Sequence, residues 1–259
     1  MIPFRLGTTS YIIPDDILPN VRYLAGKVQD VELVLFEVDH DLSNLPSPDV
    51  IKELAGLAKE NDLTYTVHLP LDLRLGAGGE ETHLSLVKAR KVIELTRPLT
   101  PWAFVMHLDA NDSGDRLAWT RQATRSLELV AEWAGGPERL AVENLYGHPL
   151  DLLRLVLDQV SVCHCVDVGH LWLDDHDPLP ILRRALPRTK VIHLHGVGSR
   201  DHQSLALIPE EQLLMVLVCL LQERYTGVVT LEVFNKQDLE TSLQTLFHTL
   251  RNIWENGLS

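Results

Sequence analysis

The sequence of 259 residues lacks several features, and each absence excludes a class of protein. Its three cysteines are too few for a disulfide framework. No run approaches the ~18 apolar residues that span a membrane, and the first residues, Met1 to Arg5, lack the apolar core of a signal peptide. We therefore expect a soluble, cytoplasmic protein with no membrane partner.

Positive charge is also scarce. The chain has 23 lysines and arginines against 36 aspartates and glutamates, which gives a formal net charge of −13. Because proteins bind duplex DNA largely through lysine and arginine contacts to phosphates, an acidic chain without a basic run is not expected to have nucleic acid as its partner. Clustered carboxylates are easier to keep where some of them bind cations.

What the sequence does contain is a regular alternation of short apolar runs with helical patterns. The runs predict strands at residues 6–10, 31–38, 63–68, 102–107, 140–143, 160–168, 190–195 and 228–234. The helical patterns cover residues 15–27, 48–61, 81–96, 116–133, 149–157, 181–186, 210–224 and 239–254. Pro48 is suited to open the second helix, with Ser47 as its cap.

This alternation predicts one α/β domain over residues 1–259, with no linker or second domain. Strands that alternate with helices pair in parallel, and eight strand–helix units in a chain of this length are typical of a (β/α)8 TIM barrel. A doubly wound open sheet is the alternative, and the lack of a G-x-G-x-x-G motif after any strand weakens it.

Each predicted strand from the third onward ends in a side chain of a type that binds metal ions. These residues are His68, His107, Glu143, Asp167, His193 and Glu232, and Glu37 is a candidate for the second strand. In a parallel barrel all strand C-termini lie on one face, so the side chains would converge. Buried carboxylates repel one another unless they are neutralised. The pattern therefore predicts a metal site at the carboxyl ends of the strands.

Further histidines lie near these strand ends. Gly169 would let the chain turn so that His170 approaches Asp167, although an Asp and a His in the first turn of a helix would give the same spacing. His202 lies in the loop 196–207, and His195 lies on the same side of its strand as His193, so either could be the ligand there. One six-coordinate ion would be satisfied by water and four strand-end residues, namely Glu143, Asp167, His193 and Glu232.

The surplus of histidines favours two or three ions in place of one. Imidazole with carboxylate suits Zn, Fe or Mn. Sites with two metals clamp the attacking and leaving oxygens in phosphoester hydrolysis, so the pattern favours a hydrolase.

The motifs that hold these residues resemble those of the xylose isomerase-like TIM barrels. They are VHLP (His68), MHLD (His107), VEN (Glu143), VDVGH (Asp167, His170), HLHG (His193), DHQSL (His202) and LEVF (Glu232). Within that superfamily, the ligand-rich set resembles the apurinic endonuclease family 2 branch, which binds up to three metals and cleaves phosphodiesters. The resemblance implies His68 and His107 on one metal with Glu143 bridging, Asp167, His193 and Glu232 on a shared or second metal, and His170 and His202 on another.

One metal position departs from the endonuclease pattern. Those enzymes have an aspartate two residues before the histidine matched by His202, and this chain has Arg200 there, with Asp201 adjacent to His202. Gly196 follows the HLH triplet, where aspartate is common. Together with the acidic composition, these departures count against an apurinic-type endonuclease.

Other segments are similar to the cobamide-remodelling phosphodiesterases of this superfamily. They are LGTTSYIIPDDILPNVRYLAG, VELVLFE, YTVHLPLDLRLG and VIHLHGV. Those enzymes cleave the nucleotide loop of a cobamide and leave cobinamide phosphate. The resemblance implies a metal-dependent phosphodiesterase with a corrinoid substrate, with Glu143 and Glu232 as catalytic residues. Candidate phosphate contacts are Arg74, Arg200 and His195, and the loops 76–79 and 196–207 are candidates for corrin contact.

Two other functions stay open at this point. The first is a sugar isomerase or epimerase with a single Mn-type ion on Glu143, Asp167, His193 and Glu232. The second is a non-catalytic corrinoid or metal carrier on the same barrel. Cys163 and Cys165, on one face of a buried strand, are expected to be core residues. The sequence does not predict the oligomeric state.

Overall fold

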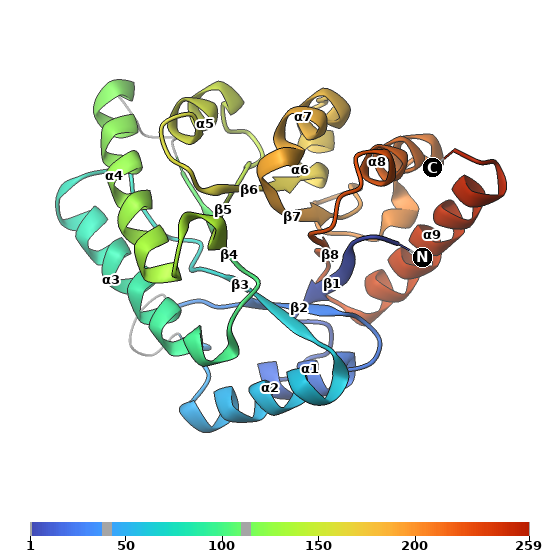
Figure 1. Cartoon of the computed structure of the whole chain (residues 1–259), viewed down its shortest axis with the longest axis horizontal. Coiled ribbons are helices and arrows are strands. Elements are labelled where there is room, and N and C mark those ends of the chain that lie inside the picture. Colours follow the sequence, from blue (N-terminus) through green and yellow to red (C-terminus); the bar gives the residue numbers. More distant parts are fainter. Residues whose placement is uncertain (1, 38–42, 110–114, 259) are drawn as a thin grey trace.

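The computed structural model describes residues 2–37, 43–109 and 115–258. Eight parallel strands pair in chain order and close into a barrel, because β8 pairs with β1. Helices surround the barrel (Figure 1). The prediction of a (β/α)8 barrel is therefore confirmed, and the open-sheet alternative is wrong. The strands are β1 Arg5–Thr9, β2 Asp30–Val34, β3 Thr64–His68, β4 Ala103–His107, β5 Leu140–Glu143, β6 Cys163–Asp167, β7 Thr189–Leu194 and β8 Val228–Leu231.

The predicted helices are present with shifted ends. They are α1 Ile17–Leu24, α2 Pro48–Asn61, α3 Gly79–Thr96, α4 Arg116–Ala134, α5 Leu150–Leu157, α7 Pro178–Ala185, α8 Glu210–Gln222 and α9 Lys236–Glu255. The helix α2 begins as predicted, because Ser47 accepts a hydrogen bond from the Val50 amide. A further short helix, α6 Val168–Leu173, directly follows β6.

The second strand ends earlier than the sequence pattern predicts. β2 stops at Val34, where the Asn44 side chain donates to the Val34 carbonyl over 2.8 Å and accepts from the Phe36 amide over 2.7 Å. This side chain replaces the partners that a continuing strand would supply. Glu37 therefore lies beyond the strand, and the predicted strand end at Val38 lies outside the described residues.

The barrel interior is layered, because side chains alternate between the two faces of each strand. A cluster of small apolar residues fills the lower part: Ala103, Val105, Ala141, Cys165 and Val191. Cys165 thus belongs to the core, and Cys163 packs against it while partly buried. The predicted ligands His107, Glu143, Asp167 and His193 lie two positions further along the same strands, so they form the layer above.

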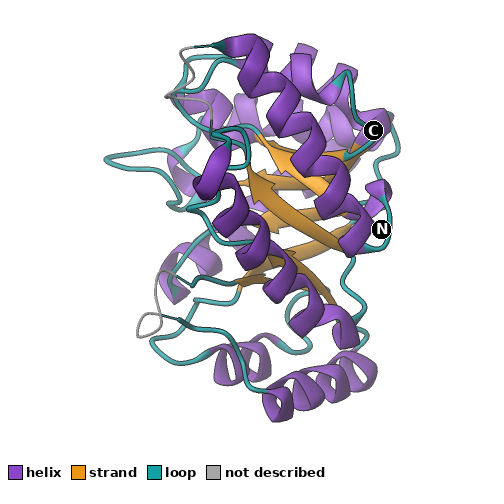
Figure 2. Cartoon of the chain, turned by 90° about the vertical axis from the view of Figure 1, so that its left-hand side faces the viewer, coloured by secondary structure: helices purple, strands orange, loops and turns teal. Residues whose placement is uncertain are grey.

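The strands all run toward one end of the molecule, where longer loops gather (Figure 2). That end holds the predicted metal ligands. Among the described residues, no helix combines the length and apolar character that crossing a membrane requires.

Candidate metal centre

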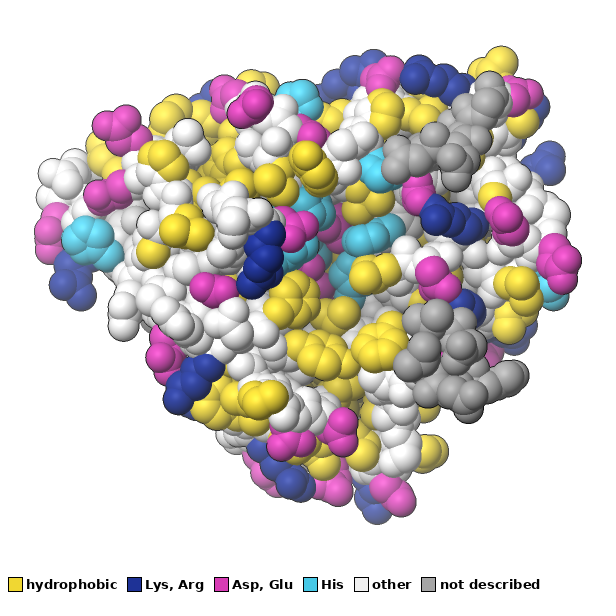
Figure 3. Space-filling model, turned by 180° about the vertical axis from the view of Figure 1, so that it is seen from behind, with side chains coloured by type: hydrophobic (Ala, Val, Ile, Leu, Met, Phe, Trp, Pro, Cys, Tyr) yellow, Lys and Arg dark blue, Asp and Glu magenta, His cyan; other side chains and the backbone are white. Residues whose placement is uncertain are grey.

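The predicted strand-end ligands converge at the mouth of the barrel. His68, His107, Glu143 and Asp167 are the last residues of their strands, and Glu232 directly follows β8. Figure 3 shows histidine and acidic side chains at the bottom of a hollow, with hydrophobic side chains around it. The ligand atoms form four overlapping groups, of which one joins Cys165 to Glu143 and His193, and the other three contain the predicted ligands.

The first group joins His68, His107 and Glu143. The Nε2 atoms of His68 and His107 lie 3.2 Å and 3.3 Å from the same oxygen, Glu143 Oε2. His68 Nδ1 lies 2.8 Å from the carbonyl of Leu69, which leaves Nε2 for the centre. This division of the ring nitrogens is common in metal-binding histidines.

The second group joins Glu143, Asp167, His193 and Glu232, all of them buried. His193 Nδ1 lies 3.5 Å from Glu143 Oε1, 3.8 Å from Asp167 Oδ2 and 3.0 Å from Glu232 Oε2. Glu143 therefore faces the first group with one carboxylate oxygen and the second group with the other. It is placed to bridge two ions.

The third group joins Asp167, His170, His195 and His202. Asp167 Oδ1 caps α6 by accepting from the His170 amide over 2.6 Å, so the alternative interpretation of this segment as the first turn of a helix is correct. The same turn brings the His170 ring back, with Nδ1 3.3 Å from Asp167 Oδ2. A helix start and a ligand position are thus compatible here.

These residues fit divalent ions. Two ligand atoms that each lie 2.0–2.1 Å from a tetrahedral zinc ion are roughly 3.3 Å apart, and most of the distances above are close to that separation. Four buried atoms of the centre have no hydrogen-bond partner among the described residues: Asp167 Oδ2, His193 Nδ1, His195 Nε2 and Glu232 Oε2. Each such atom costs about 1–3 kcal/mol when it stays unsatisfied, and a bound cation would satisfy them.

Charge in the centre is distributed between imidazoles and carboxylates. Burial alone would raise the pKa of Glu143, but His193 and His107 hold that pKa well below its usual range. The pKa of Glu232 is likewise held low against burial, mainly by His193. Burial alone would lower the pKa of His202, and its contact with Glu232 raises it to about 9. In the metal-free protein Glu143 and Glu232 are therefore ionised, and His202 is protonated at neutral pH.

The other predicted site residues lie around the centre. Glu37 is not among the converging strand-end side chains, because β2 ends at Val34, and it pairs with Lys91. Arg74 pairs with Asp109 at the rim, and Arg200 lies 4.0 Å from Asp238. His195, a candidate phosphate contact, is 0% exposed and lies within the third group.

Two buried residues support the centre although the sequence pattern did not single them out. Glu32 in β2 is 0% exposed, and its Oε2 lies 3.0 Å from His193 Nε2. The Asn144 side chain donates to the Asp167 carbonyl and accepts from the Asp167 amide, both over 2.9 Å. A glutamate inside an otherwise apolar strand was the available signal for Glu32, but its partner on β7 becomes evident only when the barrel closes.

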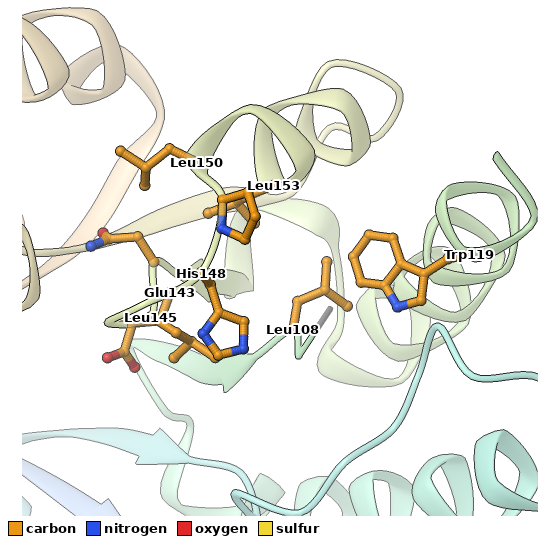
Figure 4. Close-up of a pocket in the computed structure, with 9 residues that line it drawn as sticks. Leu108, Trp119, Glu143, Leu145, His148, Leu150 and Leu153 are labelled. Atoms are coloured by element: carbon orange, nitrogen blue, oxygen red, sulfur yellow. The ribbon is translucent and has the colours of Figure 1, made fainter. Parts of the chain in front are cut away.

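A small pocket is lined in part by Glu143. Leu108, Leu145 and Leu153 line it together with His148, which Figure 4 shows on the side of Glu143 that faces Leu108 and Trp119. His148 Nε2 lies 3.0 Å from Asp109 Oδ1. Asp109 and Trp119 also border a larger cavity of about 660 Å³, whose wall includes Arg74 and the glycine-rich residues 76–78.

Comparison with known proteins places this geometry in context. A family model described as "Xylose isomerase-like TIM barrel" matches residues 27–253. No curated protein matches the chain significantly. A D-tagatose 3-epimerase-like protein superposes with a TM-score of 0.83 at 19% identity, covering 98% of this chain and 99% of that one.

Two further solved structures represent different activities on the same fold. Endonuclease IV from Thermus thermophilus has a TM-score of 0.74 at 19% identity, covering 96% of this chain and 99% of its own. D-psicose 3-epimerase from Clostridium cellulolyticum has a TM-score of 0.70 at 15% identity, covering 96% and 97%. At these identities the likeness establishes the fold alone.

Proposed function

The chain belongs to the xylose isomerase-like TIM-barrel family, and on that premise we propose that it is a metal-dependent phosphodiesterase. Its proposed substrate is an adenosylated cobamide of the pseudocobalamin or cobalamin type, whose nucleotide loop it hydrolyses to cobinamide phosphate. One observation carries the proposal: the second ligand group overlaps the first at Glu143 and the third at Asp167, and together the three groups offer more donors than a single ion accepts.

Some residues of the centre would bind the ions, and others hold those ligands in position. His68, His107 and Glu143 would hold one ion, and Glu143, Asp167, His193 and Glu232 would hold a second. Zinc, manganese or iron in such a pair polarises phosphoryl oxygens and lowers the pKa of water. Glu32 fixes the His193 ring through Nε2, and Asn144 fixes Asp167 through its backbone.

In the proposed reaction, the oxygen of water bonds to phosphorus, and the bond from phosphorus to the ribose oxygen of the nucleoside breaks. The phosphate stays on cobinamide, and the leaving ribose oxygen takes up a proton. Glu143 and Glu232 are the proposed catalytic residues. Both carboxylates are buried and have a lowered pKa, so they stay ionised and would hold the ions and position the attacking water.

The rim of the barrel favours a bulky organic substrate over a polynucleotide. Exposed large apolar side chains lie in the segments between five of the strands and the α-helices that follow them: Phe36, Leu71, Tyr146, Leu207 and Phe234. Arg74 and Arg200 at the rim face carboxylates. A corrinoid with one internal phosphodiester matches this apolar rim and the cavity of about 660 Å³ beside residues 76–78. We propose no nucleic-acid partner.

The test is direct. The purified protein is incubated with an adenosylated cobamide, the products are followed by mass spectrometry, and metal content is measured on the same sample. The proposal predicts cobinamide phosphate with at least two ions per chain, and no product from Glu143→Gln. Glu37→Gln is the matched control, because Glu37 pairs with Lys91 away from the centre. An intact cobamide would contradict the proposal.

A sugar epimerase is the second candidate, and two observations favour it. Solved structures of similar fold include a D-tagatose 3-epimerase-like protein and D-psicose 3-epimerase. The second ligand group alone would also satisfy one ion. An epimerase of this kind would leave His68, His107, His170 and His202 without a use. One ion per chain and turnover of a ketohexose would favour this candidate.

A further inference from the structure

A second cavity, of about 490 Å³, lies outside the barrel wall between α5 and α7. These helices are neighbours in the outer ring (Figure 1). Each has only eight residues, whereas α3, α4 and α9 have 18, 19 and 20. Val142 of β5 and Val166 of β6 line the cavity. Because side chains alternate along a strand, they point away from the layer that contains Glu143 and Asp167.

The lining of this cavity is mostly apolar but includes a histidine. His164 has an outward position on β6, where a strand that faces helices normally carries an apolar residue. Its ring forms no hydrogen bond with any described residue. Burial lowers the pKa of His164 to about 4, helped by Arg188. The ring is therefore neutral and can donate one hydrogen bond and accept another.

Arg188 brings a fixed positive charge to the wall of the cavity. Its guanidinium donates to the carbonyls of Leu157, over 3.0 Å, and Val160, over 2.6 Å, and also to the carbonyl of Val162. It has no carboxylate partner in the described part of the chain. The carbonyls hold the group in place but do not neutralise its charge, and a partly buried charge is usually paired.

Two exposed arginines, Arg154 on α5 and Arg184 on α7, also line the cavity. Neither forms an ion pair with another described residue. Two aspartates lie among the lining residues, of which Asp158 is exposed and Asp151 lies 3.8 Å from Arg116 of α4. The cavity therefore has an excess of positive charge, in a chain whose formal net charge is −13.

We propose that this cavity binds a small organic anion with an apolar body. A carboxylate or phosphate group would pair with Arg188 and Arg184, because the planar guanidinium matches both groups with two parallel hydrogen bonds. The apolar body would contact Val142, Val166 and Ile181. The volume falls within the range of roughly 300–1,000 Å³ that is usual for ligand pockets.

Asn144 connects this cavity with the metal centre. It lines the cavity, and its side chain makes both hydrogen bonds to the Asp167 backbone, each over 2.9 Å. The Asn144 carbonyl also lies 3.0 Å from His170 Nδ1. A ligand that restrains Asn144 should therefore slow local opening of the chain at Asp167.

The site is tested with anilinonaphthalene sulfonate, an aromatic anion that fluoresces in apolar surroundings. A fluorescence titration of the whole protein gives the Kd and the number of sites. We expect Arg184→Gln to raise the Kd about fivefold by removing one ion pair. Ile181→Trp fills the cavity and should remove one site. The matched control is Arg183→Gln, which changes the preceding, exposed arginine of α7 and should leave the Kd unchanged.

Competition then identifies the charged group of the ligand. Octanoate and octyl phosphate should displace the probe, and the tighter of the two identifies the group as carboxylate or phosphate. Octanol has the same chain without a charge and should not displace it. In amide hydrogen exchange, the tighter anion should slow exchange at Asp167 in the wild type but not in Ile181→Trp.

Equal Kd values for Arg184→Gln and Arg183→Gln, an unchanged number of sites in folded Ile181→Trp, or equal displacement by octanol would overturn the proposal. Unchanged exchange at Asp167 in the occupied protein would overturn the link to the metal centre. Circular dichroism establishes that each variant is folded. None of these measurements uses cobamide cleavage, so the site and the proposed function can fail separately.

Discussion

The two ends of the barrel interior are built from the same strands but bury their carboxylates in opposite ways. At the mouth, Glu143 and Glu232 face imidazoles, and their pKa values are held well below the usual range despite burial. Near the start of β2, Asp30 is equally buried but faces hydroxyl groups, with Thr64 Oγ1 2.5 Å from its Oδ2. Burial raises the pKa of Asp30 to about 7.

This contrast shows how neighbouring histidines change the pKa of a buried carboxylate. A carboxylate that has only hydroxyl partners is driven toward its neutral form by desolvation. At the mouth the same desolvation is overcome by histidines, and bound cations would strengthen that effect. The ionised carboxylates at the mouth lie above a layer of small apolar side chains, and they belong to residue groups that could hold metal ions.

The largest expected effect comes from substituting Glu143, the carboxylate that the first and second ligand groups have in common. Glu143→Gln keeps the size of the side chain but removes the charge and replaces one of the two oxygens, of which Oε2 faces the first ligand group and Oε1 the second. We expect kcat/KM for cobamide hydrolysis to fall by about 10³-fold or more, equivalent to ~4 kcal/mol of transition-state stabilisation. Steady-state kinetics beside Glu37→Gln provide the comparison, and equal activity of the two variants would contradict the role of Glu143.

Metal removal tests whether the mouth depends on cations for stability. An ion present at 100 times its Kd stabilises the native state by about 2.7 kcal/mol, so chelation should lower the free energy of unfolding by roughly that amount per site. Urea unfolding with and without chelator measures it. Equal unfolding midpoints under both conditions would mean that the buried atoms of the centre that have no hydrogen-bond partner among the described residues do not bind ions.

Asp30→Asn tests the other end of the comparison. The folded-state pKa of Asp30, about 7, lies above the unfolded value near 3.8. The folded state therefore binds a proton more tightly, and the stability from Asp30 is lost as pH rises from about 4 through 7. Asp30→Asn lacks this loss. Between pH 5 and pH 8 its free energy of unfolding should therefore rise relative to that of the wild type by on the order of 2 kcal/mol.

The two glutamates at the mouth should respond to pH with the opposite sign, whereas His202, whose folded-state pKa is about 9, loses its stabilisation as pH rises toward that value. Because the folded-state pKa values of Glu143 and Glu232 are lowered, their stabilisation is present above the unfolded pKa and is lost as pH falls. Urea unfolding of the metal-free protein at several pH values follows both trends. If Asp30→Asn were more stable relative to the wild type at low pH than at high pH, the raised pKa of Asp30 would be contradicted.

The smallest expected effect concerns the apolar rim. Phe234, 38% exposed, lies edge-on to the His202 ring with centroids 5.3 Å apart. Phe234→Ala should raise KM for the cobamide by about tenfold through lost apolar contact while kcat changes less. Phe247→Ala on α9 is the matched control, since Phe247 is also exposed but lies on an outer helix. A fall in kcat alone would assign Phe234 to the centre instead of the rim.

The sequence predicted the barrel and most of the converging side chains for a simple physical reason. Parallel strands place all their ends on one face, so a ligand-type residue after each apolar run already implies convergence. What it could not predict depends on long-range geometry. Glu32 meets His193 only across the closed barrel, and beyond Val34 the backbone of the β2 segment pairs with the Asn44 side chain. The burial of His195 likewise depends on a loop that folds back at Gly196.

The most direct test of the account is cobamide hydrolysis in water enriched in ¹⁸O, with the mass of the phosphorylated product measured. If the metal centre directs water to phosphorus, cobinamide phosphate will carry one ¹⁸O and the released nucleoside none. Unlabelled cobinamide phosphate with label in the nucleoside, or no cleavage at all beside epimerisation of a ketohexose, would contradict the account.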